Sequence, residues 1–215
     1  MCKIQTNRKV DSKHESVVNK FLFENYFLNC YDSATYVEDK SLQVSGVDVV
    51  VNDKMFIDIK AQSSPRYINN PTSTYILELS FLNPWGKTLK GWFLNEELKT
   101  THNAFVWINK ADVGENGYIK TDKDIHEVEI MVVDSKKLKD YILSLVDSTT
   151  LESVANELRE KKIPKTFVNG LKIVCSLNIP EQPCTIVMSK EVLKKYAVSD
   201  CILTVNGGNV SLKEV

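Results

Sequence analysis

Two aspartates lie inside apolar runs of the segment VSGVDVVVNDKMFIDIK, residues 44–60. Asp48 stands among valines, and Asp58 stands between two isoleucines with Lys60 two positions later. A carboxylate in apolar surroundings costs several kcal/mol unless a cation or a hydrogen-bond donor stabilises it. The residue types and their spacing therefore indicate that two carboxylates and an amine act together.

The alternation of apolar and polar residues predicts which way these side chains face. If residues 44–51 and 55–62 form an antiparallel hairpin, opposed residues share a face and the faces alternate with period two. A three-residue connection at 52–54 pairs Val51 with Met55, Val49 with Ile57, Asp48 with Asp58 and Gly46 with Lys60. The predicted core face is then Val47, Val49, Val51, Ile57, Ile59 and Ala61. A two-residue connection would bury Asp58 among Val and Ile, so the pattern favours the first register.

Two apposed carboxylates favour a divalent cation. At a separation of about 4 Å and an effective dielectric constant near 20, their repulsion costs roughly 4 kcal/mol. Mg²⁺ binds one or two protein carboxylates and keeps several waters, which suits Asp48 and Asp58, and it lowers the pKa of a bound water. Lys60 is placed to position that water or to neutralise charge on a phosphate. The predicted chemistry is metal-assisted hydrolysis of a phosphodiester.

These residues resemble the PD-(D/E)xK nuclease superfamily, which has the restriction-endonuclease-like fold. The shared pattern is a helix bearing Glu15, a strand, a strand with Asp48, and a strand with Asp58-Ile59-Lys60. The resemblance implies Mg²⁺, with Mn²⁺ as a substitute, and DNA as the partner. The implied metal ligands are Asp48, Asp58, the backbone carbonyl of Ile59 and, as an auxiliary ligand, Glu15. It also implies that Lys60 is the catalytic lysine and that Gln62 is an accessory residue.

Two features depart from the family pattern. Val47 stands where a proline is usual, and a predicted β-hairpin follows the D-x-K strand where the core fold has a helix. Besides these departures, there is a further resemblance to small nuclease-like proteins of phages and bacterial mobile elements. It lies in the segments SLQVSGVDVVV, FIDIKAQ and LKGWF.

The remaining chain predicts an α+β fold with a mixed central sheet flanked by helices. An opening helix starts after Ser12, and residues 63–73 read as a loop. Strands are predicted at 34–38, 42–51 and 54–62, a hairpin within 74–95, and two further strands at 104–110 and 126–134. Helices are predicted at 135–146 and 150–162. The predicted division is a nuclease-like core, residues 1–134, and a C-terminal accessory segment, residues 135–215, packed on the core as one compact domain.

Several residues have a structural interpretation beside the functional one. Glu15 fits a capping box with Ser12, and Gln62 fits a solvated strand end. Possible nucleic-acid contacts from the basic and aromatic residues Arg66, Trp85, Lys87 and Lys90 compete with packing and solubility. A second class of function, a non-catalytic nucleic-acid or protein-binding module that keeps the fold, stays open beside the nuclease.

The charge balance, the cysteines and the absence of targeting patterns indicate where the protein acts, but they say little about its substrate. The 27 Lys and Arg balance 28 Asp and Glu, so any basic surface must be local. Five cysteines without a C-x-x-C pair fit reduced thiols. Without a secretory or transmembrane pattern, the sequence predicts a cytoplasmic protein with no membrane partner. It leaves open DNA versus RNA, endonuclease versus exonuclease, specificity, pathway and the oligomeric state, for which a homodimer is one option.

Overall fold

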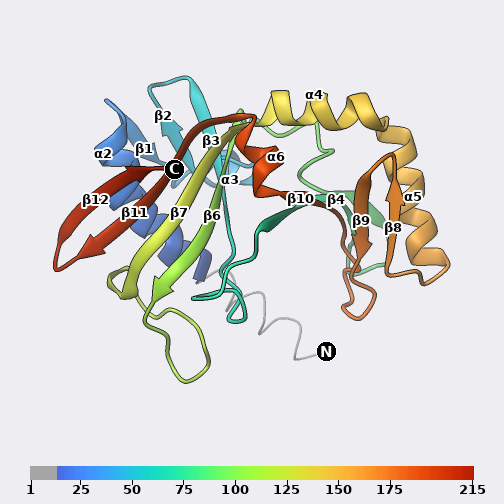
Figure 1. Ribbon diagram of the computed structural model, residues 1–215. Helices are drawn as coiled ribbons and strands as arrows, with labels where there is room; N and C mark the ends of the chain where they lie inside the picture. The colour runs from blue at the N-terminus through green and yellow to red at the C-terminus, as the bar shows by residue number, and fades with distance from the viewer. Residues whose placement is uncertain (1–13) are drawn as a thin grey trace. The chain divides into compact units, whose positions relative to one another are not determined.

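The computed structural model describes residues 14–215 (Figure 1). The chain divides into two compact units that interleave along the sequence. The first unit comprises the chain up to Thr72 together with Lys99–Asp134 and Ala197–Val215, and the second comprises Ser73–Leu98 and Ser135–Tyr196. These bounds differ from the predicted division at residue 134, because segments from both sides of it pair in each unit.

The first unit contains a large curled mixed sheet. Its strands are β1 (Ala34–Tyr36), β2 (Val49–Val51), β3 (Met55–Ala61), β6 (His102–Ala111), β7 (Ile125–Asp134), β11 (Ala197–Asn206) and β12 (Asn209–Glu214). The sheet order is β1-β2-β3-β6-β7-β11-β12, and β3 and β6 are parallel whereas the other neighbours are antiparallel. The predicted α+β fold with a mixed sheet is confirmed at this level.

The predicted opening helix packs on one face of that sheet. Residues 14–22 are helical and continue into the π-helical turn η1 (Phe23–Phe27) and α2 (Leu28–Cys30), drawn in blue in Figure 1. Val18 and Leu22 are fully buried in one core cluster with Val49, Ile57 and other sheet residues. Full burial of each such aliphatic side chain contributes roughly 1.5–3 kcal/mol, which fixes the helix on this face.

The register of the β2–β3 hairpin is the predicted one. Val49 pairs with Ile57, Val50 with Phe56 and Val51 with Met55. The connection at 52–54 places Asn52 and Asp53 at φ 49° and 55°, a left-handed conformation that Asn and Asp tolerate better than most residues. The predicted core residues Val47, Val49, Val51, Ile57 and Ile59 are buried, and Ala61 is partly buried against the same cluster.

The prediction of one strand over 42–51 is wrong for its first half. Residues Lys40–Val44 form the short helix α3, whose N-cap Asp39 accepts hydrogen bonds from the backbone amides of Ser41 and Leu42. Gly46, at φ 77°, follows the helix in the left-handed conformation typical of a helix C-terminus. The cap and the glycine together outweigh the strand propensity of this segment.

The second unit contains an antiparallel sheet with helices. Its strands are β4 (Thr74–Leu82), β5 (Thr88–Lys90), β8 (Lys165–Val168), β9 (Leu171–Cys175) and β10 (Cys184–Ser189), in the order β5-β4-β10-β9-β8. Its helices are α4 (Ser135–Leu145), α5 (Ser148–Glu160) and α6 (Lys190–Lys194). The predicted hairpin is confirmed as β4–β5, although its second strand ends at Lys90 and residues 91–95 form turns. Both predicted helices are confirmed, with Asp147 as the N-cap of α5.

The remaining element is a 3-10 turn, η2 (Asp122–Asp124), before β7. Among the described residues, no helix combines the length and the apolar character needed to cross a membrane.

Candidate functional site

Asp48 is held at the point where the β2–β3 ladder becomes irregular. The Asp48 amide donates to the Ile57 carbonyl at 2.8 Å, and the Asp48 carbonyl accepts from the Val37 amide at 2.9 Å. Asp48 Oδ2 then accepts from the Ile59 amide at 2.8 Å. The side chain therefore takes the place of a backbone acceptor in the ladder, and this bond fixes the direction of the carboxylate.

Asp58 and Lys60 form an ion pair on the neighbouring strand. Lys60 Nζ lies 2.9 Å from Asp58 Oδ2, with the side chains 27% and 7% exposed respectively. Asp58 Oδ2 is buried and receives no well-aligned hydrogen bond within residues 14–215, so the lysine contacts it without satisfying its directional lone pairs. The contact compensates charge and leaves an acceptor site free.

The carboxyl groups of Asp48 and Asp58 are close enough to share a hydrogen bond. Burial raises the pKa of Asp58 to about 6, the positive charge of Lys60 opposes the rise, and the charges of Asp48 and Glu15 add to it. Burial also raises the pKa of Asp48, against the lowering effects of the Ile59 amide, Lys60 and Asp58. Below about pH 6 Asp58 is therefore protonated, and its carboxyl group can donate a hydrogen bond to the Asp48 carboxylate.

Lys60 remains protonated at neutral pH. Burial disfavours its charged form, but the attraction of Asp58, Asp48 and Glu15 outweighs burial and raises its pKa. In this state the amine donates hydrogen bonds and cannot accept a proton. It suits stabilisation of negative charge rather than general-base catalysis.

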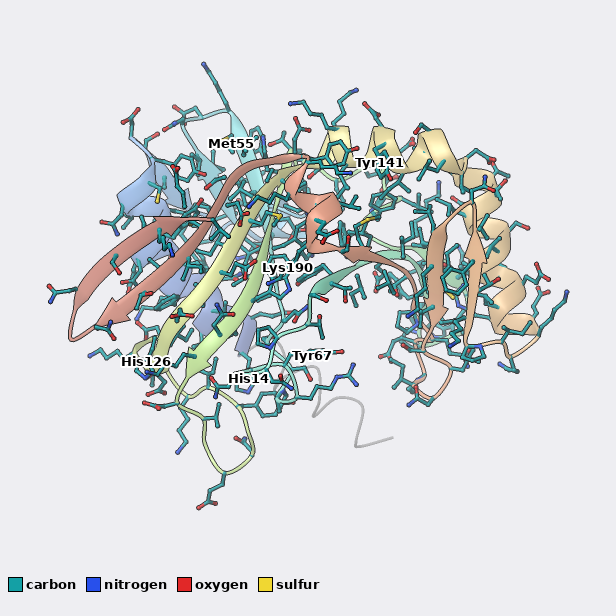
Figure 2. All side chains as sticks on the ribbon, in the orientation of Figure 1. His14, Met55, Tyr67, His126, Tyr141 and Lys190 are labelled. Atoms are coloured by element: carbon teal, nitrogen blue, oxygen red, sulfur yellow. The ribbon has the colours of Figure 1, made fainter. Side chains whose placement is uncertain are left out.

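Glu15 lies on the exposed side of the opening helix, near the site. Its negative charge raises the pKa of both Asp58 and Lys60. In Figure 2, His14 lies toward the same end of the first unit as Tyr67 of the 63–73 loop, whereas Met55, at the start of β3, lies at the other end. The interpretation of Glu15 as part of a capping box needs Ser12, which lies outside the described residues.

Asn103 is a site neighbour that the sequence did not indicate. It pairs with Asp58 in the parallel β3–β6 register and is only 3% exposed. The available signal was a polar residue in the otherwise apolar run NAFVWI, the same signal that marked the two aspartates. This signal does not link Asn103 to the site, because the sequence alone does not predict that β3 pairs with β6.

Gln62 closes the loop that follows β3. Its side-chain amide donates to Thr72 Oγ1 at 2.9 Å, and its carbonyl accepts from the Thr72 amide at 3.1 Å. These two bonds join the ends of the predicted and confirmed loop. The geometry gives Gln62 a positioning role for the loop.

The weaker nucleic-acid candidates are distributed over both units. Arg66, in the first unit, stacks on the Tyr67 ring at 4.4 Å and also contacts its hydroxyl. In the second unit, Trp85 is 88% exposed at the β4–β5 turn and Lys87 is exposed beside it. Lys90 Nζ pairs with Glu152 at 3.1 Å, so part of its charge is compensated.

The residues present can accommodate a divalent cation through two carboxylates. Within residues 14–215, no three acidic, histidine or cysteine side chains gather closely enough to hold a metal by themselves. Asp48 and the under-coordinated Asp58 Oδ2 fit Mg²⁺, which keeps most of its waters. The Ile59 amide points to Asp48, and because the N–H and C=O of one strand residue point to the same side, its carbonyl is directed there too.

Comparison with known proteins gives no family: no family model, curated protein or solved structure matches the chain. The functional assignment therefore depends on the residues of the site.

Proposed function

We propose that the protein is a Mg²⁺-dependent nuclease that hydrolyses phosphodiester bonds of DNA, with a restriction-endonuclease-like core. The observation that carries the proposal is the convergence of Asp48, Asp58 and Lys60, with a buried Asp58 oxygen that lacks an aligned donor. Burial disfavours the ionised form of both carboxylates, so placing them here is unfavourable for stability alone. A cation at this place would remove that cost.

The roles of the residues follow from how each is held. Asp48 and Asp58 would hold the cation, aided by the Ile59 carbonyl, and Mn²⁺ would fit the same oxygen ligands. When bound, the cation supplies Lewis-acid activation of the phosphate and a lowered pKa for an attacking water. Lys60 donates hydrogen bonds to the phosphate or to that water and neutralises developing charge. Glu15 would contribute negative charge from the helix as an auxiliary ligand, and Gln62 keeps the adjoining loop in place.

The order of elements supports the same proposal. A helix bearing Glu15 precedes β1, β2 follows directly after Asp48, and β3 carries Asp58 and Lys60. This is the order that the resemblance implies. The segment after β3 forms the β4–β5 hairpin of the second unit instead of a helix, so this part of the resemblance does not extend to the substrate-binding side.

A non-catalytic binding module is the second candidate, and one observation favours it. The Lys60–Asp58 ion pair already compensates part of the charge, and the described residues provide two clustered carboxylates rather than three. A module of this kind would bind nucleic acid or protein without a cation.

The test is cleavage of linear, circular and branched DNA, with RNA in parallel, in Mg²⁺, Mn²⁺ or EDTA. Variants Asp48→Asn and Asp58→Asn are preferable to alanine, because the amide oxygen of an asparagine in place of Asp48 can still accept from the Ile59 amide. The matched control is Asp32→Asn, at an exposed position. We expect cleavage only with the cations, its loss in both site variants, and full activity in the control.

The outcomes separate the two candidates. Cleavage of circular DNA identifies an endonuclease, and cleavage restricted to linear DNA identifies an exonuclease. Binding that persists in EDTA without any cleavage would support the module. Cleavage that survives Asp58→Asn would refute the metal-site assignment. The proposal includes a cytoplasmic location and a phage or mobile-element setting.

A further inference from the structure

Two thiols oppose each other in the second unit, remote in sequence from the aspartate site. Cys184, the first residue of β10, pairs directly with Cys175, the last residue of β9. Both are buried and reduced. They end the β9–β10 ladder, next to the connecting loop at 176–183.

The backbone shows that the two cysteines form a non-hydrogen-bonded pair. The Ser176 amide donates to the Pro183 carbonyl at 3.0 Å, so the hydrogen-bonded pair is the next one along. The Cys175 amide donates instead to the Pro164 carbonyl at 2.8 Å, away from β10. In an antiparallel sheet, the Cα atoms of such a pair lie about 4.5 Å apart, with their side chains close together. A disulfide spans Cα separations of roughly 4.4–6.8 Å, so no strand need move for one to form.

The thiols also contact one another, and each lies near a backbone carbonyl. The Cys175 thiol lies within hydrogen-bond reach of Cys184. Cys184 Sγ lies 3.4 Å from the Ala155 carbonyl, and Cys175 Sγ lies 3.6 Å from the Gln182 carbonyl. The sulfurs are thus directed into one space between α5 and the end of the hairpin.

A buried cation lies beside this pair. Arg159 is 5% exposed and donates to neutral acceptors: the carbonyls of Gln182 and Ser80, the Ser80 hydroxyl and the Asn156 side chain. Burial raises the pKa of the Cys184 thiol well above its usual range, the contact with Cys175 adds to the rise, and the positive charge of Arg159 opposes it in part. A thiolate is the nucleophile in disulfide exchange, and a neighbouring cation stabilises it.

We propose that Cys175 and Cys184 form a reversible redox pair that closes a disulfide across the end of β9 and β10. With a small-molecule disulfide as oxidant, one cysteine thiolate attacks a sulfur of the oxidant and releases one thiol. The other cysteine then displaces the second thiol and forms the Cys175–Cys184 bond. Two cysteine protons and two electrons are transferred, and two thiol molecules leave. Opening of the 176–183 loop gives the oxidant access, since its residues are all partly or fully exposed.

The closed disulfide should strengthen the second unit. It closes a short ring around the 176–183 loop and reduces the conformational freedom of the unfolded chain. We expect oxidation to raise the melting temperature by about 5 °C, a size typical of one short-loop disulfide in a domain.

The experiment equilibrates the full chain with oxidised glutathione, blocks free thiols with N-ethylmaleimide and digests with trypsin. No Lys or Arg lies between Ile173 and Ser189, so both cysteines fall in the peptide 173–190. We expect this peptide to lose two hydrogen atoms, to take up no maleimide, and to take up two after dithiothreitol. Cys184→Ser should abolish both the closed peptide and the rise in melting temperature, whereas Cys30→Ser should retain both.

Cys30 is exposed in the first unit and serves as the internal reference for oxidation. The proposal is overturned if peptide 173–190 still takes up two maleimides once Cys30 is fully glutathionylated at equilibrium. It is also overturned if only mixed disulfides form, or if the closed peptide appears only in denaturant. Cys175→Ser provides a second variant should Cys184→Ser fail to fold, and neither outcome depends on nuclease activity.

Discussion

Replacement of Asp58 by Asn should stabilise the metal-free protein at neutral pH. The two side chains have nearly the same shape, so the change removes the charge and leaves the packing of β3 intact. Asp58 is buried, and its pKa of about 6 in the folded chain lies above the ordinary 3.8. The folded state therefore holds the proton more tightly than the unfolded state does.

The size of the effect follows from that difference. One pKa unit corresponds to about 1.4 kcal/mol, so ionisation of Asp58 costs the folded state about 3 kcal/mol at pH 7.5. Because the pKa of Asp58 is raised in the folded state, protonation of Asp58 stabilises the folded state. This stabilisation is fully present below pH 3.8 and is lost as the pH rises through about 6. The gain from Asp58→Asn should thus shrink to less than about 1 kcal/mol at pH 4.

The assay is thermal unfolding in EDTA at pH 4, 5 and 7.5, for wild type, Asp58→Asn and the control Asp32→Asn. With roughly 2–4 °C per kcal/mol for a chain of this size, the melting temperature should rise by about 6–12 °C at pH 7.5. Added Mg²⁺ should then stabilise the wild type and the control, because the ion binds the folded state and not the unfolded one. Asp58→Asn should not be stabilised, because it lacks one of the two proposed carboxylate ligands.

A fall in the melting temperature of Asp58→Asn at pH 7.5 in EDTA would refute this reasoning. It would mean that the ion pair with Lys60 contributes more than burial costs and that Asp58 is a structural partner of the lysine. An unchanged gain between pH 4 and 7.5 would show that the effect does not arise from ionisation.

Three further substitutions test other parts of the structure. Lys60→Met should have the opposite effect to Asp58→Asn, because it removes the charge that compensates Asp58. We expect denaturant unfolding at pH 7.5 to show a loss of roughly 1–3 kcal/mol in the stability of the metal-free protein. A stabilised variant would contradict the ion-pair account. Glu15→Gln should leave the melting temperature nearly unchanged but weaken Mg²⁺ affinity in calorimetry and slow turnover; full activity at limiting Mg²⁺ would favour the capping role with Ser12. Gly91→Ala should destabilise the second unit by about 1–3 kcal/mol or more, since its Cβ would lie 2.3 Å from the Glu78 carbonyl oxygen, and an unchanged thermal transition would disprove that contact.

The sequence predicted the hairpin because its signal is local. Alternation over residues 44–60 admits only one register that keeps Asp58 off the core face, and the pairing of Val49 with Ile57 agrees with it. The helix α3 escaped prediction because two single residues decide it: the N-cap Asp39 and the left-handed Gly46. Such positions carry little weight in a pattern of apolar residues.

The long-range pairings were not predictable in the same way. Asn103 lies opposite Asp58 only because β6 pairs in parallel with β3, after a connection that passes through the second unit. Similarly, β10 pairs with β4 and β11 with β7, which divides the segment 135–215 between two sheets. A periodic pattern shows which face of a strand is buried, but the choice of neighbour depends on packing across the whole sheet.

The two carboxylates of the site differ in how firmly they are held, and this difference bears on Lys60. Asp48 is fixed by the Ile59 amide, whereas Asp58 is held by its ion pair with Lys60, and its Oδ2 accepts no backbone hydrogen bond within residues 14–215. A cation would therefore compete with Lys60 for Asp58 rather than displace Asp48 from its backbone bond. Once Asp58 turns to another partner, the lysine loses its nearest counter-charge, and its partly exposed side chain becomes available to an incoming phosphate. The ion pair of the metal-free state would thus keep the Lys60 amine beside the place where the substrate needs a positive charge, so the ion pair is compatible with catalysis.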